Sequence, residues 1–367
     1  MNNFKVFIYI FSCLFFCCNS DKNESNDSKY GSITGETFVL TDLAQNHLTK
    51  ENISDLKIYS IDSTRNKHFW KENIDYIVKN NKISRTSNSN IPNFGKHNVI
   101  YNNNSFTFSA SPRNPPLNIP FQIYADYKFF DFEYIKGEYD KTYLSTPLKD
   151  KLKNKEQIKI GVIGTSITAG AHTLEQFYHN SDKESYPYLL AKGVEKLYGN
   201  NISITNYSKS GSSIDYLATV FQKVIEDGND LVLIEFGMND HLYSSWELEM
   251  PRFESNISSA IEKFKAHNID VVIVGFFQQN PQWDLEFLNS TLAYNQLLFK
   301  LGEKYNCYFA DVNKEFSRYS QTKINQDFCG DFMHHPTSFG HLLYYKTIIP
   351  AFLKKEVTDG FLYSLIN

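Results

Sequence analysis

Residues that could carry out nucleophilic catalysis are concentrated in the second half of the chain. Ser166 lies in the segment GTSIT (164–168), directly after an apolar run, and a hydroxyl at such a strand-to-helix turn lies where helix N-terminal amides can face an anion. Asp331, His334 and His335 lie together in one short segment further along the chain. A hydroxyl, an imidazole and a carboxylate can act as nucleophile, general base and the group that orients the base. These residues predict an acyl-transfer site with Ser166 as its nucleophile.

Two further segments could stabilise the oxyanion that forms when a serine attacks a carbonyl. Gly211 lies in SKSGS (208–212), after a second apolar run, and Asn239 lies in GMND (237–240), after a third. The backbone N–H groups of Ser166 and Gly211 and the side-chain amide of Asn239 are suitable donors, each worth about 3 kcal/mol in comparable hydrolases. Ser166 could instead be a helix N-cap, and Gly211 and Asn239 could be turn formers. Those structural roles are compatible with catalysis.

The elements that must position these residues follow from the pattern after residue 157. Apolar runs of strand length alternate with amphipathic stretches of helical length, which is typical of a parallel sheet covered by helices. Strands are expected at 158–163, 202–207, 231–236, 271–276 and 307–312, and helices at 188–197, 216–226, 253–266, 288–304 and 339–353. Because sites in such sheets lie beyond the carboxyl ends of the strands, we expect the segments above to meet at one edge.

The chain before this α/β region has a different pattern. Residues 31–147 alternate short β-favouring runs with Asn, Pro and Gly clusters, which predicts a small, mostly-β domain, most simply a sandwich. Residues 148–156 are charged and rich in lysine, and we expect them to connect this domain to the α/β domain at residues 157–367. The β-rich part shows no catalytic constellation.

The N-terminus has the features of an export signal. Lys5 precedes an apolar run, residues 6–16, that is too short to span a bilayer and ends at Cys17 and Cys18. We expect residues 1–18 to be an export signal and the polar residues 19–30 to be a tether. A cysteine at this place resembles a bacterial lipoprotein cleavage site, with Cys18 or Cys17 carrying the lipid. The expected location is therefore outside the cytoplasm, anchored by lipid in the periplasm or at the cell surface, or secreted after ordinary signal cleavage.

The composition favours a globular protein and disfavours some partners. Hydrophobic residues make up 41% of the chain, and the net charge of -4 is spread without long blocks of one sign, so no nucleic-acid partner is expected. Cys307 and Cys329 could pair in an oxidising compartment if the fold brings them close, but neither has metal-ligand spacing. His334 and His335 as metal ligands would lack a third partner nearby. We expect no metal and no cofactor.

Taken together, the four segments resemble the SGNH, or GDSL-type, hydrolase family of esterases and lipases over residues 157–353. In that family a serine after the first strand, a glycine after the second, an asparagine in Gly-x-Asn-Asp and an Asp-x-x-His pair carry the chemistry, and Ser166, Gly211, Asn239 and the Asp331 segment match them. The resemblance implies a three-layer α/β/α fold with a five-stranded parallel sheet of the flavodoxin type. Thr165 departs from the family, which most often has aspartate beside the serine.

The histidine of the expected Ser-His-Asp triad is ambiguous. The spacing from Asp331 selects His334, whereas the family's His-Pro pairing selects His335. We prefer His335, because Pro336 restricts the backbone of its neighbour and a small bulge in the loop can absorb the extra residue. His334 is kept as the alternative. His172, His241 and His341 also lie near these motifs and are assigned no role.

The resemblance, the export signal and the leading β-rich part favour an esterase that removes acetyl or similar O-acyl groups from carbohydrate through an acyl-enzyme. A lipase or lysophospholipase and a sugar O-acyltransferase are the alternatives within enzymes. A glycan-binding lipoprotein without activity is the alternative outside them, although every triad and oxyanion position is filled. Aromatic residues in the loops could line a substrate cleft or simply pack. They are Phe177, Tyr178, Tyr243, Trp246, Phe277 and Trp283.

Overall fold

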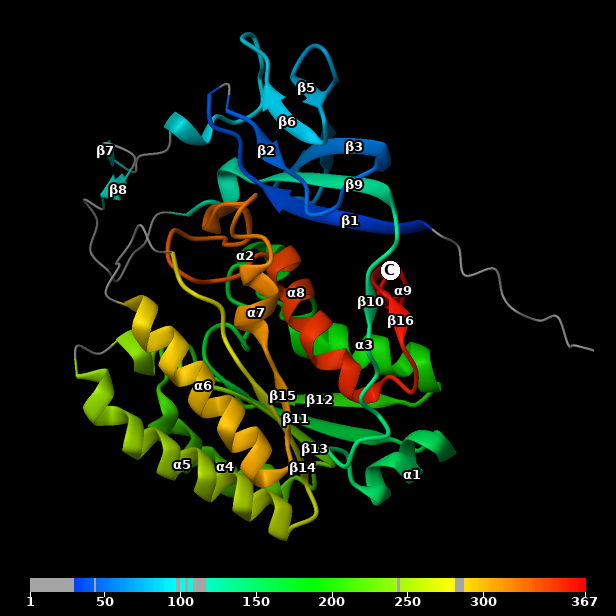
Figure 1. The fold of residues 1–367 in the computed structure, drawn as a ribbon, viewed down its shortest axis with the longest axis vertical. Coiled ribbons are helices and arrows are strands. Elements are labelled where there is room, and N and C mark those ends of the chain that lie inside the picture. The colour runs from blue at the N-terminus through cyan, green and yellow to red at the C-terminus, as the bar shows by residue number, and fades with distance from the viewer. Residues whose placement is uncertain are drawn as a thin grey trace, which may run out of the picture.

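A computed structural model describes residues 30–42, 44–96, 100–102, 105–107, 117–242, 245–280 and 287–367. Within these residues the chain forms an α/β unit and a β-rich region that lies at one end of it (Figure 1). The expected signal, residues 1–18, and residues 19–29 of the expected tether (19–30) lie outside the described part, whereas Tyr30 is the first residue of a strand. Within that part, no helix is both long and apolar enough to cross a membrane.

The α/β unit is built on a parallel sheet of five strands in the order β12-β11-β13-β14-β15. The strands are β11 (Ile158–Gly164), β12 (Ile202–Asn206), β13 (Leu231–Glu235), β14 (Asp270–Val274) and β15 (Tyr308–Ala310). Residues of β13 and β14 are buried on both faces, which explains their continuous apolar sequence. The strand order is that of flavodoxin-like folds, so the predicted fold class is confirmed.

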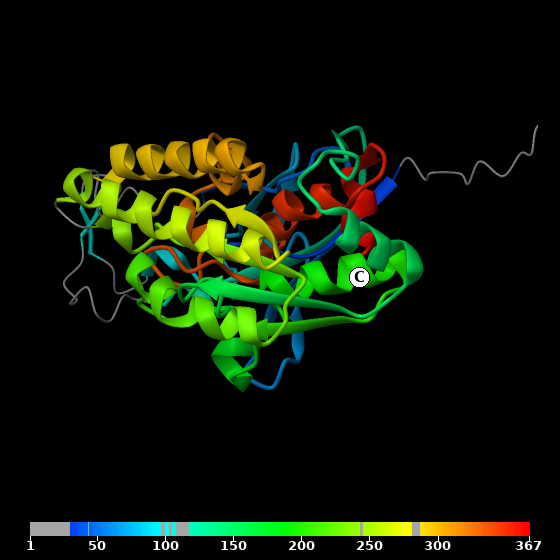
Figure 2. The same cartoon turned by 90° about the horizontal axis from the view of Figure 1, so that it is seen from below.

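Helices cover both faces of this sheet and complete three layers (Figures 1 and 2). On one face α3 packs against α8, and on the other α5 packs against both α4 and α6. Their bounds are α3 (Tyr186–Tyr198), α4 (Leu217–Glu226), α5 (Trp246–Ala266), α6 (Phe287–Tyr305) and α8 (Ser338–Ile348). Short helices α2 (Leu174–His179), α7 (Val312–Ser317) and α9 (Asp359–Ser364) complete the unit. Each expected strand and helix has its counterpart, with boundaries shifted by a few residues. Helix α5 differs most, because it begins at Trp246 and not at residue 253.

The β-rich region consists mainly of two antiparallel sheets. One has the order β1-β9-β3-β4, with β1 (Tyr30–Phe38), β3 (Ile53–Ile61), β4 (Lys67–Phe69) and β9 (Ile123–Phe130). The other has the order β2-β6-β5, with β2 (Asn46–His47), β5 (Tyr76–Lys79) and β6 (Lys82–Arg85), and β7 (Ile100–Asn102) pairs with β8 (Ser105–Thr107). The predicted mostly-β character of this region is therefore confirmed.

The stretch between the two regions is not an extended linker. Residues 146–154 form α1 (Thr146–Asn154), whose Leu148 and Leu152 are buried in the main hydrophobic core. The hydroxyl of Ser145 accepts a hydrogen bond from the N–H of Leu148 and caps the helix. Two apolar residues at helical spacing among many lysines thus anchor this segment to the sheet.

The β-rich region and the α/β unit share one continuous core. Strand β1 packs against α9, and β10 (Tyr134–Ile135) pairs with β16 (Val357–Thr358) near the C-terminus. Glu36 on β1 forms an ion pair with Lys323 at 2.7 Å, and both side chains are fully buried. Lys50 pairs in the same way with the buried Asp359 at 2.6 Å. A buried charge that loses its partner is strongly destabilising. Because each of these pairs has one member in each region, the pairs favour the two regions staying in contact.

Candidate active site

Ser166 lies in the turn that follows β11, at the carboxyl edge of the sheet. Glu235, the last residue of β13, stabilises this turn through hydrogen bonds. Its carboxyl oxygen accepts hydrogen bonds from the N–H of Thr165 at 3.1 Å, the hydroxyl of Thr165 at 2.8 Å and the hydroxyl of Thr168 at 2.9 Å. Complete burial raises the pKa of Glu235 to about 7, although these hydrogen bonds oppose the shift. The threonine that replaces the family's usual aspartate is therefore bonded to a carboxyl group from the neighbouring strand.

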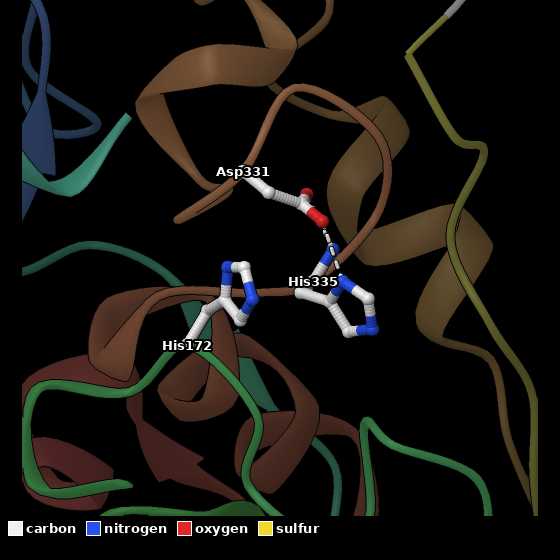
Figure 3. Close-up of side chains that lie close together, drawn as sticks. All are labelled: His172, Asp331 and His335. Atoms are coloured by element: carbon white, nitrogen blue, oxygen red, sulfur yellow. Dashed lines mark hydrogen bonds and ion pairs between the residues drawn. The ribbon is translucent and has the colours of Figure 1, made fainter. Parts of the chain in front are cut away.

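His335 connects Ser166 to Asp331 through both of its ring nitrogens. Figure 3 shows the contact between His335 and Asp331. Nε2 lies 2.7 Å from the hydroxyl oxygen of Ser166, and Nδ1 lies 2.5 Å from one carboxylate oxygen of Asp331. Because an ionised carboxylate can only accept, Nδ1 carries the proton and Nε2 is the acceptor for the serine hydroxyl. The structure thus brings the three residues into the contacts that a nucleophile, base and acid require.

Asp331 is buried and is held by its own loop. Its other carboxylate oxygen accepts hydrogen bonds from the backbone N–H groups of Met333, His334 and His335, at 3.0, 3.0 and 3.1 Å. Burial alone would raise the pKa of Asp331, but the adjacent His335 holds it below its usual range. Asp331 is therefore ionised at neutral pH. The stability that this ion contributes is present above the ordinary pKa of an aspartate and is lost as the pH falls below it.

The two adjacent histidines have different surroundings. The side chain of His335 is 17% exposed and faces Ser166, whereas His334 is buried, and burial lowers its pKa to about 3. His334 is thus a neutral group packed inside the loop, with its ring centre 4.5 Å from that of His335. Of the two candidates, the geometry places His335 against the serine.

The two expected oxyanion segments adjoin the turn of Ser166. The hydroxyl of Ser212 donates to the carbonyl of Gly164 at 3.2 Å, and the side-chain amide of Asn239 donates to the carbonyl of Ser212 at 2.8 Å. An amide nitrogen carries two N–H groups, so this contact occupies one of them. Gly211 has a φ of +74°, a conformation that glycine adopts without strain. The loops after β11, β12 and β13 are thus joined at the edge where Ser166 lies.

Residues 162–343 match the model of the GDSL-like lipase/acylhydrolase family. The α/β unit of this chain belongs to that family. It is therefore a carboxylic ester hydrolase of the SGNH/GDSL type, as the four segments predict. No protein of curated function matches the chain in sequence.

Two solved structures resemble this chain over about half of its length. Axe2, an acetylxylan esterase from Geobacillus stearothermophilus, is 19% identical, with a TM-score of 0.45 over 53% of this chain and 93% of that protein. A protein described as a GDSL-like lipase, from Parabacteroides merdae ATCC 43184, is 19% identical, with a TM-score of 0.44 over 54% of this chain and 96% of that one.

His172 lies beside His335, although no pattern in the sequence assigns it a role. Its ring stacks on that of His335, with ring centres 4.7 Å apart and planes inclined by 24° (Figure 3). Its φ of +68° is unusual for a residue other than glycine. A side chain at Gly330 would approach the Cβ of His172 to 2.7 Å, so only glycine fits beside it. Burial lowers the pKa of His172, which keeps it neutral next to a ring that must accept a proton.

A metal ion could in principle use the same three side chains. Ligand atoms of His172, Asp331 and His335 lie within 4.8 Å of one another. However, Nδ1 of His335 is directed at Asp331 and Nε2 at Ser166, so a metal would have to displace one of these hydrogen bonds. The residue types and contacts suit a serine nucleophile better than a metal centre.

The other histidines near the motifs have structural contacts. Nδ1 of His241 lies 2.9 Å from the carbonyl of Gly237, and burial lowers the pKa of His241 to about 4. Nδ1 of His341 accepts from the N–H of Tyr186 at 3.3 Å, and burial lowers its pKa to about 3. Both are neutral, buried groups. Cys307 and Cys329 are buried free thiols.

A cavity of about 280 Å³ lies beside the loop that carries Asp331 and His335. Asn280 lines it and also donates from its backbone N–H to Met333 and from its side-chain amide to the carbonyl of Phe332. The cavity has a mixed lining of amide side chains, hydroxyls, one lysine and apolar groups, namely Gln278, Gln279, Asn280, Asn313, Ser317, Ser320, Lys323, Asn325, Gln326, Ile324, Phe277, Phe316 and Phe328. Of the aromatic residues expected in a substrate cleft, Phe277 borders this cavity, Trp246 is partly buried against the core, and Tyr243 and Trp283 lie outside the described residues.

Proposed function

We propose that this GDSL hydrolase is a serine esterase in which Ser166 acts as the nucleophile, His335 as the general base and acid, and Asp331 as the carboxylate that orients His335. The observation that carries this proposal is the unbroken chain of hydrogen bonds from the hydroxyl of Ser166 through His335 to Asp331. Such a chain lets a weak nucleophile lose its proton as it attacks.

The proposed reaction proceeds through an acyl-enzyme. The hydroxyl oxygen of Ser166 attacks the ester carbonyl carbon while its proton passes to Nε2 of His335. The tetrahedral intermediate collapses, and His335 returns the proton to the departing alcohol oxygen. Water, deprotonated by His335, then attacks the acyl-serine ester and releases the acid and the free serine. Asp331 remains ionised throughout and stabilises the imidazolium that forms in each half.

Asn239 is proposed as a donor to the oxyanion, together with the N–H groups of Ser166 and Gly211. Replacing Asn239 with alanine is expected to lower kcat by roughly a hundredfold or more and to change KM much less, since the interaction strengthens only as charge develops on the oxygen. The measurement is steady-state hydrolysis of a short nitrophenyl ester. A variant that raises KM and keeps its kcat would indicate that Asn239 binds substrate in its ground state instead.

We further propose that the substrate is an O-acylated, most simply O-acetylated, carbohydrate. The cavity beside the Asp331 loop supports this choice, because amides and hydroxyls can hydrogen-bond sugar hydroxyls and aromatic faces can pack on sugar C–H groups.

The substrate class is tested with matched esters. Acetate release from acetylated xylan and other acetylated glycans is measured beside hydrolysis of nitrophenyl acetate and nitrophenyl palmitate. Higher kcat/KM on acetylated glycans and acetyl esters supports the proposal, and preference for palmitate identifies a lipase. Acyl transfer to added sugar in preference to water identifies an acyltransferase. Failure of a fluorophosphonate probe to label Ser166 would indicate a binding protein without activity.

We also propose that the protein is exported and anchored by lipid at Cys18 or Cys17. Replacing both cysteines with serine is expected to move the protein from the membrane fraction to the soluble fraction, because the proposed lipid chain is what attaches it to the bilayer. The check is fractionation of cells with and without the two changes. Partition that stays with the membrane after both changes would count against lipid anchoring.

A further inference from the structure

The Asp-His loop, residues 327–337, is bound on one side by the β-rich region. Asn118 makes the closest contact: its side-chain amide donates to the carbonyl of Asp331 at 2.5 Å and to that of Cys329 at 3.0 Å. Its backbone N–H donates to the carbonyl of Gly330 at 2.8 Å. Gln122 directly follows the short helix η2 (Ile119–Phe121). Its side-chain amide donates a further hydrogen bond to the carbonyl of Cys329 at 2.9 Å. Both amide side chains are buried.

The two ends of the Asp-His loop are held by the first strand and the segment after it. The hydroxyl of Thr37 donates to the carbonyl of Asp327 at 2.6 Å and lies 2.9 Å from the hydroxyl of Thr337. The carboxylate of Asp327 accepts from the backbone N–H of Val39 at 2.9 Å and from the side chain of Asn46 at 2.8 Å. Both ends of the loop are thereby fixed to the same part of the β-rich region.

An apolar contact completes this interface. Phe332, the residue after Asp331, is fully buried in a cluster with Val39 and Phe94, and Phe121 packs against them. Three members of this cluster come from the β-rich region. The residue next to Asp331 is therefore packed against side chains of the β-rich region.

We propose that the β-rich region positions the Asp-His loop, and that Asn118 is a positioning residue that acts on His335 through the main chain of Asp331. This inference rests on the proposed function, because the orientation of Asp331 matters only if the three residues work as a triad. The position of the Asp331 backbone determines whether its carboxylate reaches Nδ1 of His335. Asn118 donates hydrogen bonds to three consecutive backbone carbonyls, from residue 329 to Asp331, and so fixes that position. A displacement of about 1 Å at such a place can cost about a hundredfold in rate.

Asn200 provides a matched control for a test of this role. Its side-chain amide also donates to two backbone carbonyls, those of Lys151 and Glu156, at 3.0 and 2.7 Å, and it is buried as well. These contacts lie at the junction of α1 and β11, at the opposite end of the sheet strand from Ser166. Loss of this amide should weaken the fold in a similar way without touching the Asp-His loop.

The experiment compares Asn118→Ala with Asn200→Ala in the full chain. Asn118→Ala is expected to lower kcat for nitrophenyl acetate by about a hundredfold, to change KM by less than about threefold, and to slow fluorophosphonate labelling of Ser166 in parallel. Asn200→Ala is expected to lower the melting temperature by a similar amount while keeping kcat within about twofold of the unchanged protein. A kcat for Asn118→Ala equal to that of Asn200→Ala would overturn the proposal.

Two further variants keep the test decisive. If Asn118→Ala does not fold, Gln122→Ala removes a single bond to the same loop and is expected to lower kcat by about threefold to tenfold, and an unchanged kcat overturns the proposal. Ser166→Ala is measured in parallel. Activity that survives in Ser166→Ala defeats the proposed triad and this inference with it, whereas an inactive Ser166→Ala beside a fully active Asn118→Ala defeats the positioning role alone.

Discussion

Ester hydrolysis is expected to fall by about a millionfold when Ser166 is replaced with alanine, because triad members act as one unit and loss of the nucleophile removes the covalent route altogether. The fold should persist. The Ser166 hydroxyl contacts His335, while the backbone of the turn is held by the hydrogen bonds of Thr165 and Thr168 to Glu235. The measurement is hydrolysis of nitrophenyl acetate, with folding followed by circular dichroism.

Ser203 offers a control for the loss of one hydroxyl. It lies on β12, the strand next to β11, and its hydroxyl makes a long contact of 3.5 Å with the carbonyl of Ile158, at the far end of β11 from Ser166. Ser203→Ala is expected to keep near-normal turnover and full labelling by a fluorophosphonate. Turnover near the unchanged level in Ser166→Ala would mean that another residue attacks the ester, and the proposed mechanism would have to be abandoned.

The α/β unit could be predicted from the sequence because its signals are local. Strands such as 231–235 are buried on both faces and therefore read as continuous apolar runs, and each ends in a segment with its own chemistry. The parallel order then fixes where those ends meet. Ser166, Gly211 and Asn239 come to one edge of the sheet for that reason, without any need to know how their loops are held.

The rest of the site depends on contacts between residues far apart in the sequence. Asn118 and Asp331 are more than two hundred positions apart, and no periodicity links them. Glu235 looks like the last residue of a buried strand, and its bond to Thr165 becomes visible only when β11 and β13 pair. His172 lies close to the nucleophile segment in the sequence, but its stacking on His335 requires the turn and the Asp-His loop to be placed together. Interactions of this kind follow only from the fold.

The second large loss of activity is expected when the general base, His335, is replaced. His335→Ala should cost nearly as much activity as Ser166→Ala, since without the imidazole Ser166 has no group to take its proton and Asp331 has nothing to orient. His334→Ala should keep much of the turnover. That ring is buried and neutral, so its loss is expected to appear as a reduction of the free energy of unfolding by about 0.5–3 kcal/mol.

The two neighbouring variants are controls for each other, because they remove the same ring from adjacent positions of one loop. Turnover of nitrophenyl acetate and the denaturant midpoint are measured for both, beside Ser166→Ala. The structure predicts opposite patterns of turnover: His335→Ala is inactive and His334→Ala is active, while the denaturant midpoints show that both variants are folded. The reason is that the ring of His335 lies against the hydroxyl of Ser166, whereas the ring of His334 is buried and its backbone N–H donates to Asp331. An inactive His334→Ala beside an active His335→Ala would show that the strict Asp-x-x-His spacing identifies the base and that His335 does not.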